Sequence, residues 1–266
     1  VLYSQYGVLM YAVATKTVGA VPVGAPEPEL RTDVDALLGL TTPRTRLLFL
    51  ANPNNPTGCL LPDAEVRRLH AGLRQDVLLV LDSAYAEYVG GEDYQDGARL
   101  VRASENVVML RTFSKIHCLA ALRIGWAYGP PSVADVLHRV RNPFNVNAPA
   151  QAAALAALTD RDHAAAGRAH NDRWLPWFRD QLAARGYAAL ASAGNFVLAR
   201  FGGDTEAVTA RLHRHGIIPR GMRPYGLPEY LRITIGLEHE LRAVLAALDE
   251  LAADRPGNRW RAGARP

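Results

Sequence analysis

Lysine is rare in this chain, and one of its two lysines stands among hydroxyl and small apolar side chains. Of the 30 lysine and arginine residues, only Lys16 and Lys115 are lysines. An arginine side chain stays protonated, whereas the ε-amine of lysine can lose its proton and react with an aldehyde. We interpret Lys115 as a candidate for covalent amine chemistry and Lys16 as a surface residue.

Side chains that suit a phosphate group lie close to Lys115 in the sequence. Thr112 and Ser114 carry hydroxyls, and Arg123 can donate a charge-assisted fork of hydrogen bonds to an anion. An amine beside such ligands could react with an aldehyde that is anchored by a phosphate. The alternative is a loop in which these polar residues occur by chance.

Two further polar segments could contribute to the same site. Asp82 ends an apolar run and could hold a cationic heterocycle, while the phenol of Tyr85 could bind a neighbouring oxygen. The alternative for Asp82 is a helix N-cap. The string NPNNPTG at residues 52–58 is stiffened by two prolines and presents the amide of Asn55, although it could equally be a plain turn between strand and helix.

These polar groups each follow a segment that resembles a buried strand. Continuous apolar runs at 46–51, 77–81 and 106–110 are separated by helical stretches such as 62–73. This pattern predicts a parallel sheet that is covered on both faces. Ligands of such sheets bind beyond the carboxyl ends of the strands. We therefore expect the candidate side chains to meet at one edge.

The character of the chain changes near residue 147. We expect an α/β domain, with a mostly parallel sheet and helices on both faces, over residues 1–146. A smaller α+β domain over 147–254 and a polar tail over 255–266 should follow. The elements expected in the smaller domain are helices at 148–158, 163–186 and 238–252 and strands at 196–200 and 231–235. The first residues look like the end of a strand and lack an initiator Met, so we expect further sequence upstream.

Composition excludes several classes of function. The net charge is +4, but the arginines are scattered among acids, which argues against a nucleic-acid partner. No run approaches the roughly 18 apolar residues of a membrane span. The N-terminus is not a secretory signal. Cys59 and Cys118 lie far apart and form neither a disulfide framework nor a metal motif. We expect a cytoplasmic protein without a metal site.

Three strings together resemble a known family. NPNNPTG at 52–58, DSAYAEY at 82–88 and TFSKIHCLAALRIGW at 112–126 are similar to motifs of the fold-type I, class-II-like aminotransferases that depend on pyridoxal 5′-phosphate. Their order and spacing most resemble the histidinol-phosphate aminotransferases, and the resemblance runs from Tyr6 to Ala252. Three departures stand out: the family's N-terminal segment is absent, Val8 falls where an aromatic ring usually stacks on the cofactor, and Cys118 replaces a glycine.

The resemblance implies a role for each residue around the cofactor ring. Lys115 would hold pyridoxal phosphate covalently and later move the α-proton of the substrate. Asp82 would pair with the pyridine nitrogen and keep it protonated. Asn55 and Tyr85 would hydrogen-bond the oxygen at the 3′ position of the ring.

The resemblance also implies two sets of anion ligands. Ser114 and Arg123, with Thr112, would hold the cofactor phosphate. Arg220 and Arg232, in the smaller domain, would bind the carboxylate of an amino donor or the phosphate of histidinol phosphate.

The implied activity is transfer of an amino group from histidinol phosphate to 2-oxoglutarate, giving imidazole-acetol phosphate and glutamate in histidine biosynthesis. The family members are homodimers that build the pocket at the subunit interface. An aromatic amino acid aminotransferase and a decarboxylase of a phosphorylated amino acid remain alternatives. A third alternative is a fragment that keeps the sheet and acts as an interaction domain.

Overall fold

The chain folds into two compact units. The computed structural model describes residues 1–91, 93–203 and 205–253. Unit 1 consists of the described residues of Val1–His170 with Ser192–Gly194, and unit 2 consists of Asn171–Ala191 with the described residues from Asn195 onward. The expected domain boundary between residues 146 and 147 stays a prediction. The expected tail at 255–266 lies outside the described residues.

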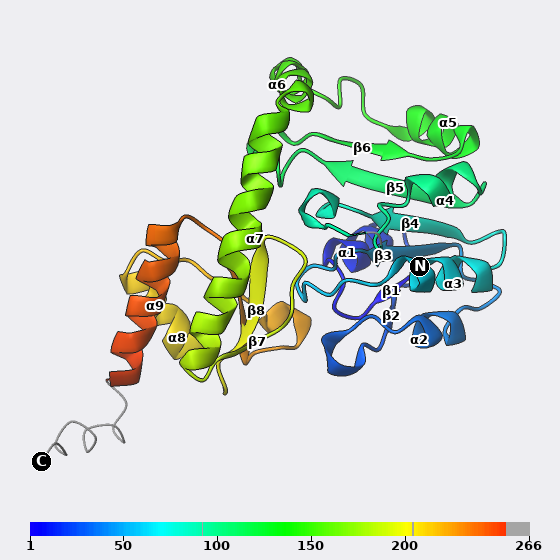
Figure 1. The fold of residues 1–266 in the computed structure, drawn as a ribbon. Helices are drawn as coiled ribbons and strands as arrows, with labels where there is room; N and C mark the ends of the chain where they lie inside the picture. The colour runs from blue at the N-terminus through cyan, green and yellow to red at the C-terminus, as the bar shows by residue number, and fades with distance from the viewer. Residues whose placement is uncertain (92, 204, 254–266) are drawn as a thin grey trace, which may run out of the picture. The chain divides into compact units, whose positions relative to one another are not determined.

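Unit 1 is built on a mostly parallel sheet (Figure 1), as the apolar runs predict. Neighbouring strands from β2 to β5 are parallel, and β6 is antiparallel to β5. The three predicted strands are β3, β4 and β5. In spatial order the strands are β2 (Val23–Ala25), β1 (Leu2–Ser4), β3 (Leu47–Ala51), β4 (Leu78–Asp82), β5 (Val107–Thr112) and β6 (Gly125–Tyr128).

Helices cover both faces of this sheet because successive side chains of a strand point to opposite sides. Leu48 and Leu50 of β3 join a buried core with α2 (Val34–Gly39), α3 (Asp63–Gly72) and α4 (Ala98–Arg102). On the other face, Phe49 stacks on a ring from α1 (Met10–Thr17). The helices α5 (Pro131–Val140) and α6 (Ala148–Thr159) follow β6 in the chain.

Unit 2 contains an antiparallel sheet with helices, which is the α+β architecture expected from the sequence. Buried side chains from α7, α8, α9 and the sheet form its core. The strands, in spatial order, are β7 (Ala188–Ala189), β8 (Phe196–Arg200), β10 (Tyr230–Thr234) and β9 (Arg220–Gly221). The helices are α7 (Arg161–Ala184), which begins in unit 1, α8 (Glu206–Arg214) and α9 (Glu238–Ala253).

Candidate active site

The candidate residues of unit 1 surround one cavity of about 360 Å³. Each of the three motifs contributes to its wall, although the motifs lie up to 70 residues apart in the sequence. All the unit 1 residues that the sequence singles out for cofactor binding line it, namely Asn55, Asp82, Tyr85, Thr112, Ser114, Lys115 and Arg123. Val8 lines it as well.

The register of the sheet explains why these segments meet. Ala51, the last residue of β3, pairs with Asp82, the last residue of β4, and Asp82 pairs with Leu110 of β5. Hydrogen bonds continue beyond the strands, since the Asn52 amide donates to the Asp82 carbonyl over 3.0 Å. The carboxyl ends of three parallel strands therefore stand side by side, and the loops that leave them enclose the cavity.

The loop after β3 is fixed by its own asparagines. The Asn52 side chain donates to the Leu61 carbonyl and accepts from the Leu61 amide, both over 2.9 Å. Asn54 Nδ2 donates to Thr57 Oγ1 over 3.0 Å. Gly58 closes the loop at φ +77°, where a Cβ would also collide with Ser192. Two of the three asparagines thus build the turn, and the third, Asn55, faces the cavity.

Asp82 is held at both carboxylate oxygens. The Tyr11 hydroxyl donates to Oδ2 over 2.7 Å, and the Ala84 amide donates to Oδ1 over 3.2 Å. Burial raises the pKa of the Asp82 carboxyl above its ordinary value, while these two hydrogen bonds and the positive charge of Lys115 oppose the rise. The carboxylate is therefore a half-buried acceptor at a strand end, and the bond from Ala84 closes a local turn without capping a helix.

Lys115 is half-buried and lies against an aromatic ring. Its Nζ is 5.2 Å from the ring centroid of Tyr85, within the range of a cation–π contact. Two turn bonds shape its loop, from the Ser114 amide to Thr112 Oγ1 over 3.1 Å and from the Cys118 amide to the Lys115 carbonyl over 2.9 Å. Cys118 has φ +57°, a conformation that glycine adopts at lower cost. Lys16, in contrast, is exposed, as predicted.

Two neighbours of the cavity were not found from the sequence. Tyr11 reaches Asp82 from 71 positions away. Arg111, whose backbone lies on β5 next to Thr112, donates from Nη2 to Glu87 over 2.6 Å and from Nη1 to Asp96 over 2.8 Å. A contact between residues distant in the chain leaves no periodic pattern in the sequence, so no local signal marks the Tyr11 hydrogen bond or the Arg111 ion pairs.

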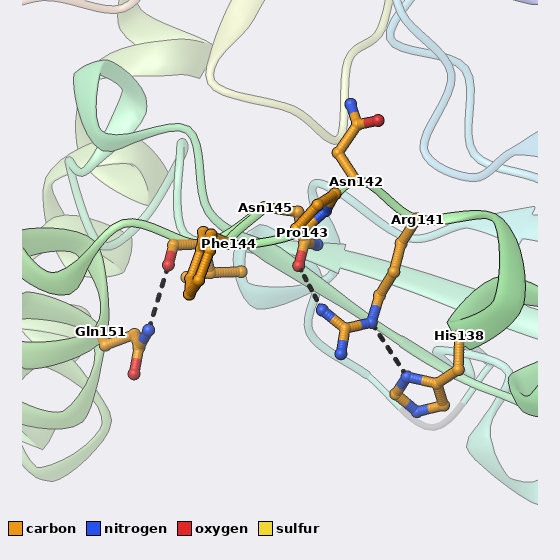
Figure 2. Close-up of a pocket in the computed structure, with 8 residues that line it drawn as sticks. His138, Arg141, Asn142, Pro143, Phe144, Asn145 and Gln151 are labelled. Carbon is orange, nitrogen blue, oxygen red and sulfur yellow. Dashed lines mark hydrogen bonds between the residues drawn. The ribbon is translucent and has the colours of Figure 1, made fainter.

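A larger cavity of about 710 Å³ lies elsewhere in unit 1 (Figure 2). Arg141 donates to His138 Nδ1 over 3.1 Å and to Asn145 Oδ1 over 2.8 Å, so these polar groups satisfy one another. Phe144 beside them is 96% exposed. None of the residues that the sequence singles out lines this cavity, and its size alone does not make it a catalytic site.

Comparison with known proteins identifies the family. The model of the class I and II aminotransferases matches residues 1–248. The chain belongs to this family. It is 56% identical over 254 residues to histidinol-phosphate aminotransferase of Paramagnetospirillum magneticum, covering 94% of this chain and 70% of the relative. It is 51% identical to histidinol-phosphate aminotransferase of Rhodospirillum rubrum, with 95% and 70% covered.

A solved aminotransferase supports the same assignment. The crystal structure of histidinol-phosphate aminotransferase from Sinorhizobium meliloti, in complex with pyridoxal 5′-phosphate, matches with a TM-score of 0.87 and 32% identity. The match covers 95% of this chain and 70% of that one. The predicted family and the predicted fold-type I architecture are confirmed. The chain spans about 70% of the length of these relatives.

The donor set of the cavity fits pyridoxal phosphate, the cofactor of this aminotransferase family. An amine, a half-buried carboxylate and a phenol line the cavity, at Lys115, Asp82 and Tyr85. Hydroxyls and a guanidinium stand at Thr112, Ser114 and Arg123. Arg123 adopts a left-handed backbone conformation, and its Nη1 donates to the Ala120 carbonyl over 2.6 Å, so the charged group is fixed near the loop.

The two arginines expected to bind substrate lie in unit 2 of the aminotransferase. Arg220 on β9 and Arg232 on β10 are register partners and line a cavity of about 520 Å³. The Arg232 guanidinium stands 4.9 Å from the ring centroid of Phe196. Two positive side chains beside one cavity favour an anionic ligand.

No helix in the described parts of the aminotransferase is both long enough and apolar enough to cross a membrane.

Proposed function

We propose that the chain transfers the amino group of histidinol phosphate to 2-oxoglutarate, giving imidazole-acetol phosphate and glutamate, a reaction of histidine biosynthesis. The observation that carries the proposal is the cavity whose wall contains both the Lys115 amine and the half-buried Asp82 carboxylate. Relatives that are 50–56% identical are named histidinol-phosphate aminotransferases, which supports histidinol phosphate as the substrate.

Pyridoxal phosphate, when bound, supplies an aldehyde that captures amino groups and a ring that withdraws electrons from the carbon bearing the amino group. Lys115 Nζ would hold the aldehyde between turnovers and carry the proton that leaves and returns to the substrate carbon. The Asp82 carboxylate would keep a proton on the ring nitrogen. Asn55 and the phenol of Tyr85 would orient the ring through its oxygen at the 3′ position.

The phosphate of the cofactor would be held by Ser114, Thr112 and Arg123. The hydroxyls each donate one hydrogen bond, and the guanidinium adds a charge-assisted one. These three residues line the same cavity as Lys115, so they would hold the phosphate beside the amine.

Arg220 and Arg232 would bind the anionic group of the substrate. A guanidinium binds a phosphate or a carboxylate through a planar fork of donors. Two of them beside one cavity could accept the phosphate of histidinol phosphate in one half-reaction and a carboxylate of glutamate or 2-oxoglutarate in the other.

The chain is also proposed to act as a homodimer in the cytoplasm. Several apolar side chains on β6 and α5 support an interface, because they are exposed in the described chain: Trp126, Tyr128, Val136, Leu137 and Val140. Cys59 and Cys118 are free thiols, which fits a reducing compartment. Light scattering during gel filtration would measure the mass, and a monomer at micromolar concentration would contradict the dimer.

The substrate assignment is tested by an assay with purified protein and added pyridoxal phosphate. Histidinol phosphate with 2-oxoglutarate should yield glutamate, and Lys115→Ala should abolish the yield. Turnover of phenylalanine but not of histidinol phosphate would favour an aromatic aminotransferase. Release of CO₂ from a phosphorylated amino acid would favour a decarboxylase.

A further inference from the structure

Tyr11 connects the helix α1 to the carboxylate of the candidate site. Its side chain is only 7% exposed. The ring stacks on Phe49 of β3, with centroids 4.6 Å apart and planes at 10°, and meets Tyr3 edge-on at 6.3 Å. Its hydroxyl donates to Asp82 Oδ2 over 2.7 Å. The phenol is thus held by packing on the strand next to β4, which ends at Asp82.

We propose that Tyr11 is a positioning residue for Asp82, which fixes the orientation of the carboxylate and keeps it ionised opposite the ring nitrogen of the cofactor. The inference rests on the proposed function, in which Asp82 holds a proton on that nitrogen. Tyr11 lies outside the three motifs that resemble the family, and it is on α1 and not at the end of a strand, so neither observation assigns it this role.

Two opposing effects decide the charge of Asp82. Burial favours the neutral acid and raises the carboxyl pKa, while the bond from Tyr11, the Ala84 amide and the charge of Lys115 favour the ionised form. Of these three, the bond from Tyr11 opposes burial most strongly. A neutral Asp82 could not stabilise a protonated ring nitrogen, so the phenol acts on the cofactor through the carboxylate.

The segment that carries Tyr11 also reaches the cavity. The Tyr11 amide donates to the Val8 carbonyl over 2.9 Å, and Val8 lines the cavity. Thr15 Oγ1 donates to the Tyr11 carbonyl over 2.6 Å, one turn later in α1. Val8, just before α1, and Tyr11, in its first turn, therefore place an apolar contact and a phenol donor on the same site.

The test compares Tyr11→Phe, which removes only the hydroxyl and keeps the ring on Phe49, with the matched control Tyr3→Phe from the same aromatic cluster. Dissociation constants are measured on the full 266-residue chain for pyridoxal phosphate and for its 1-deaza analogue, in which carbon replaces the ring nitrogen. Tyr11→Phe should raise the dissociation constant for pyridoxal phosphate by about ten- to a hundredfold, as expected for loss of a hydrogen bond to a charged group. It should leave the affinity for the analogue unchanged, and Tyr3→Phe should change neither constant.

Equal weakening of both ligands by Tyr11→Phe would show a merely structural role and overturn the inference, as would no weakening of either. The variant Asp82→Asn distinguishes a failure of the proposed function of Asp82 from a failure of the role proposed for Tyr11. If Asp82→Asn does not weaken pyridoxal phosphate, the proposed function of Asp82 fails. If Asp82→Asn does weaken binding of pyridoxal phosphate, adding Tyr11→Phe to that variant should cause no further loss of affinity. Additive losses of affinity would refute the coupling between Tyr11 and Asp82.

Discussion

Replacement of Arg111 by glutamine should destabilise unit 1 strongly. The Arg111 guanidinium binds Glu87 over 2.6 Å and Asp96 over 2.8 Å, and the side chains of Arg111 and Glu87 are 14% and 20% exposed. It also lies 5.6 Å from the centroid of the Trp126 ring. The substitution leaves two carboxylates without their cation, and water reaches Glu87 poorly.

The expected loss follows from this burial. Removal of one partner of a buried ion pair costs about 3–5 kcal/mol. The side chain of Asp96 is 36% exposed and regains some hydration, so we expect the lower end, about 3 kcal/mol. For a unit of this size each kcal/mol moves the thermal midpoint by about 2–4 °C, which gives a fall of about 6–12 °C.

The assay is thermal unfolding followed by circular dichroism, with Arg139→Gln as the control. Arg139 pairs with Asp135 on one helix, where the two side chains are 68% and 69% exposed. Such a surface pair contributes about 0.5 kcal/mol or less. Equal midpoints for Arg111→Gln and Arg139→Gln would refute the reasoning from burial.

Three further changes have defined outcomes. Asp82→Asn should lower the transamination rate by about 10²–10³-fold, as for a lost charge-stabilising group. Asp82→Asn should also stabilise the cofactor-free protein at neutral pH, because burial raises the pKa of the Asp82 carboxyl and the folded protein therefore loses stability as pH rises through that pKa. The stability gained by the substitution should vanish at pH values below the ordinary aspartate pKa. A difference in thermal midpoint between variant and parent that does not change with pH would contradict this expectation. Arg232→Gln should raise the KM for histidinol phosphate by about 10–100-fold with a smaller effect on kcat, and an unchanged KM would exclude Arg232 as an anion ligand. Val8→Phe should tighten pyridoxal phosphate binding by about two- to tenfold through ring stacking, and equilibrium titration that finds weaker binding would show that the cavity lacks room for the ring.

The lining of the cavity could be predicted from the sequence because it depends on strand patterns that are local in the chain. The apolar runs that became β3, β4 and β5 are continuous, so they predicted parallel strands whose ends meet. Asp82 at the end of β4 was therefore expected to lie close to Asn55 and Lys115, which come after β3 and β5. Turn interpretations were also partly right, since Asn52 and Asn54 bind within their own loop.

The supporting contacts could not be anticipated in the same way. Tyr11 and Asp82 are 71 positions apart, and Arg111 reaches carboxylates 15 and 24 positions away. These bonds depend on which strands are neighbours, which the spacing of apolar residues along one strand does not specify. The antiparallel β6 was missed as well, because it is only 4 residues long and its side chains are exposed.

We expect Lys115 to capture the aldehyde of pyridoxal phosphate, and Lys16, the other lysine of the chain, serves as an internal control. The purified protein is incubated with the cofactor, reduced with borohydride and digested, and the labelled peptides are identified by mass spectrometry. We expect a pyridoxyl group on the peptide that contains Lys115 and none on the peptide that contains Lys16. A label on Lys16 alone, or no label at saturating cofactor, would contradict it.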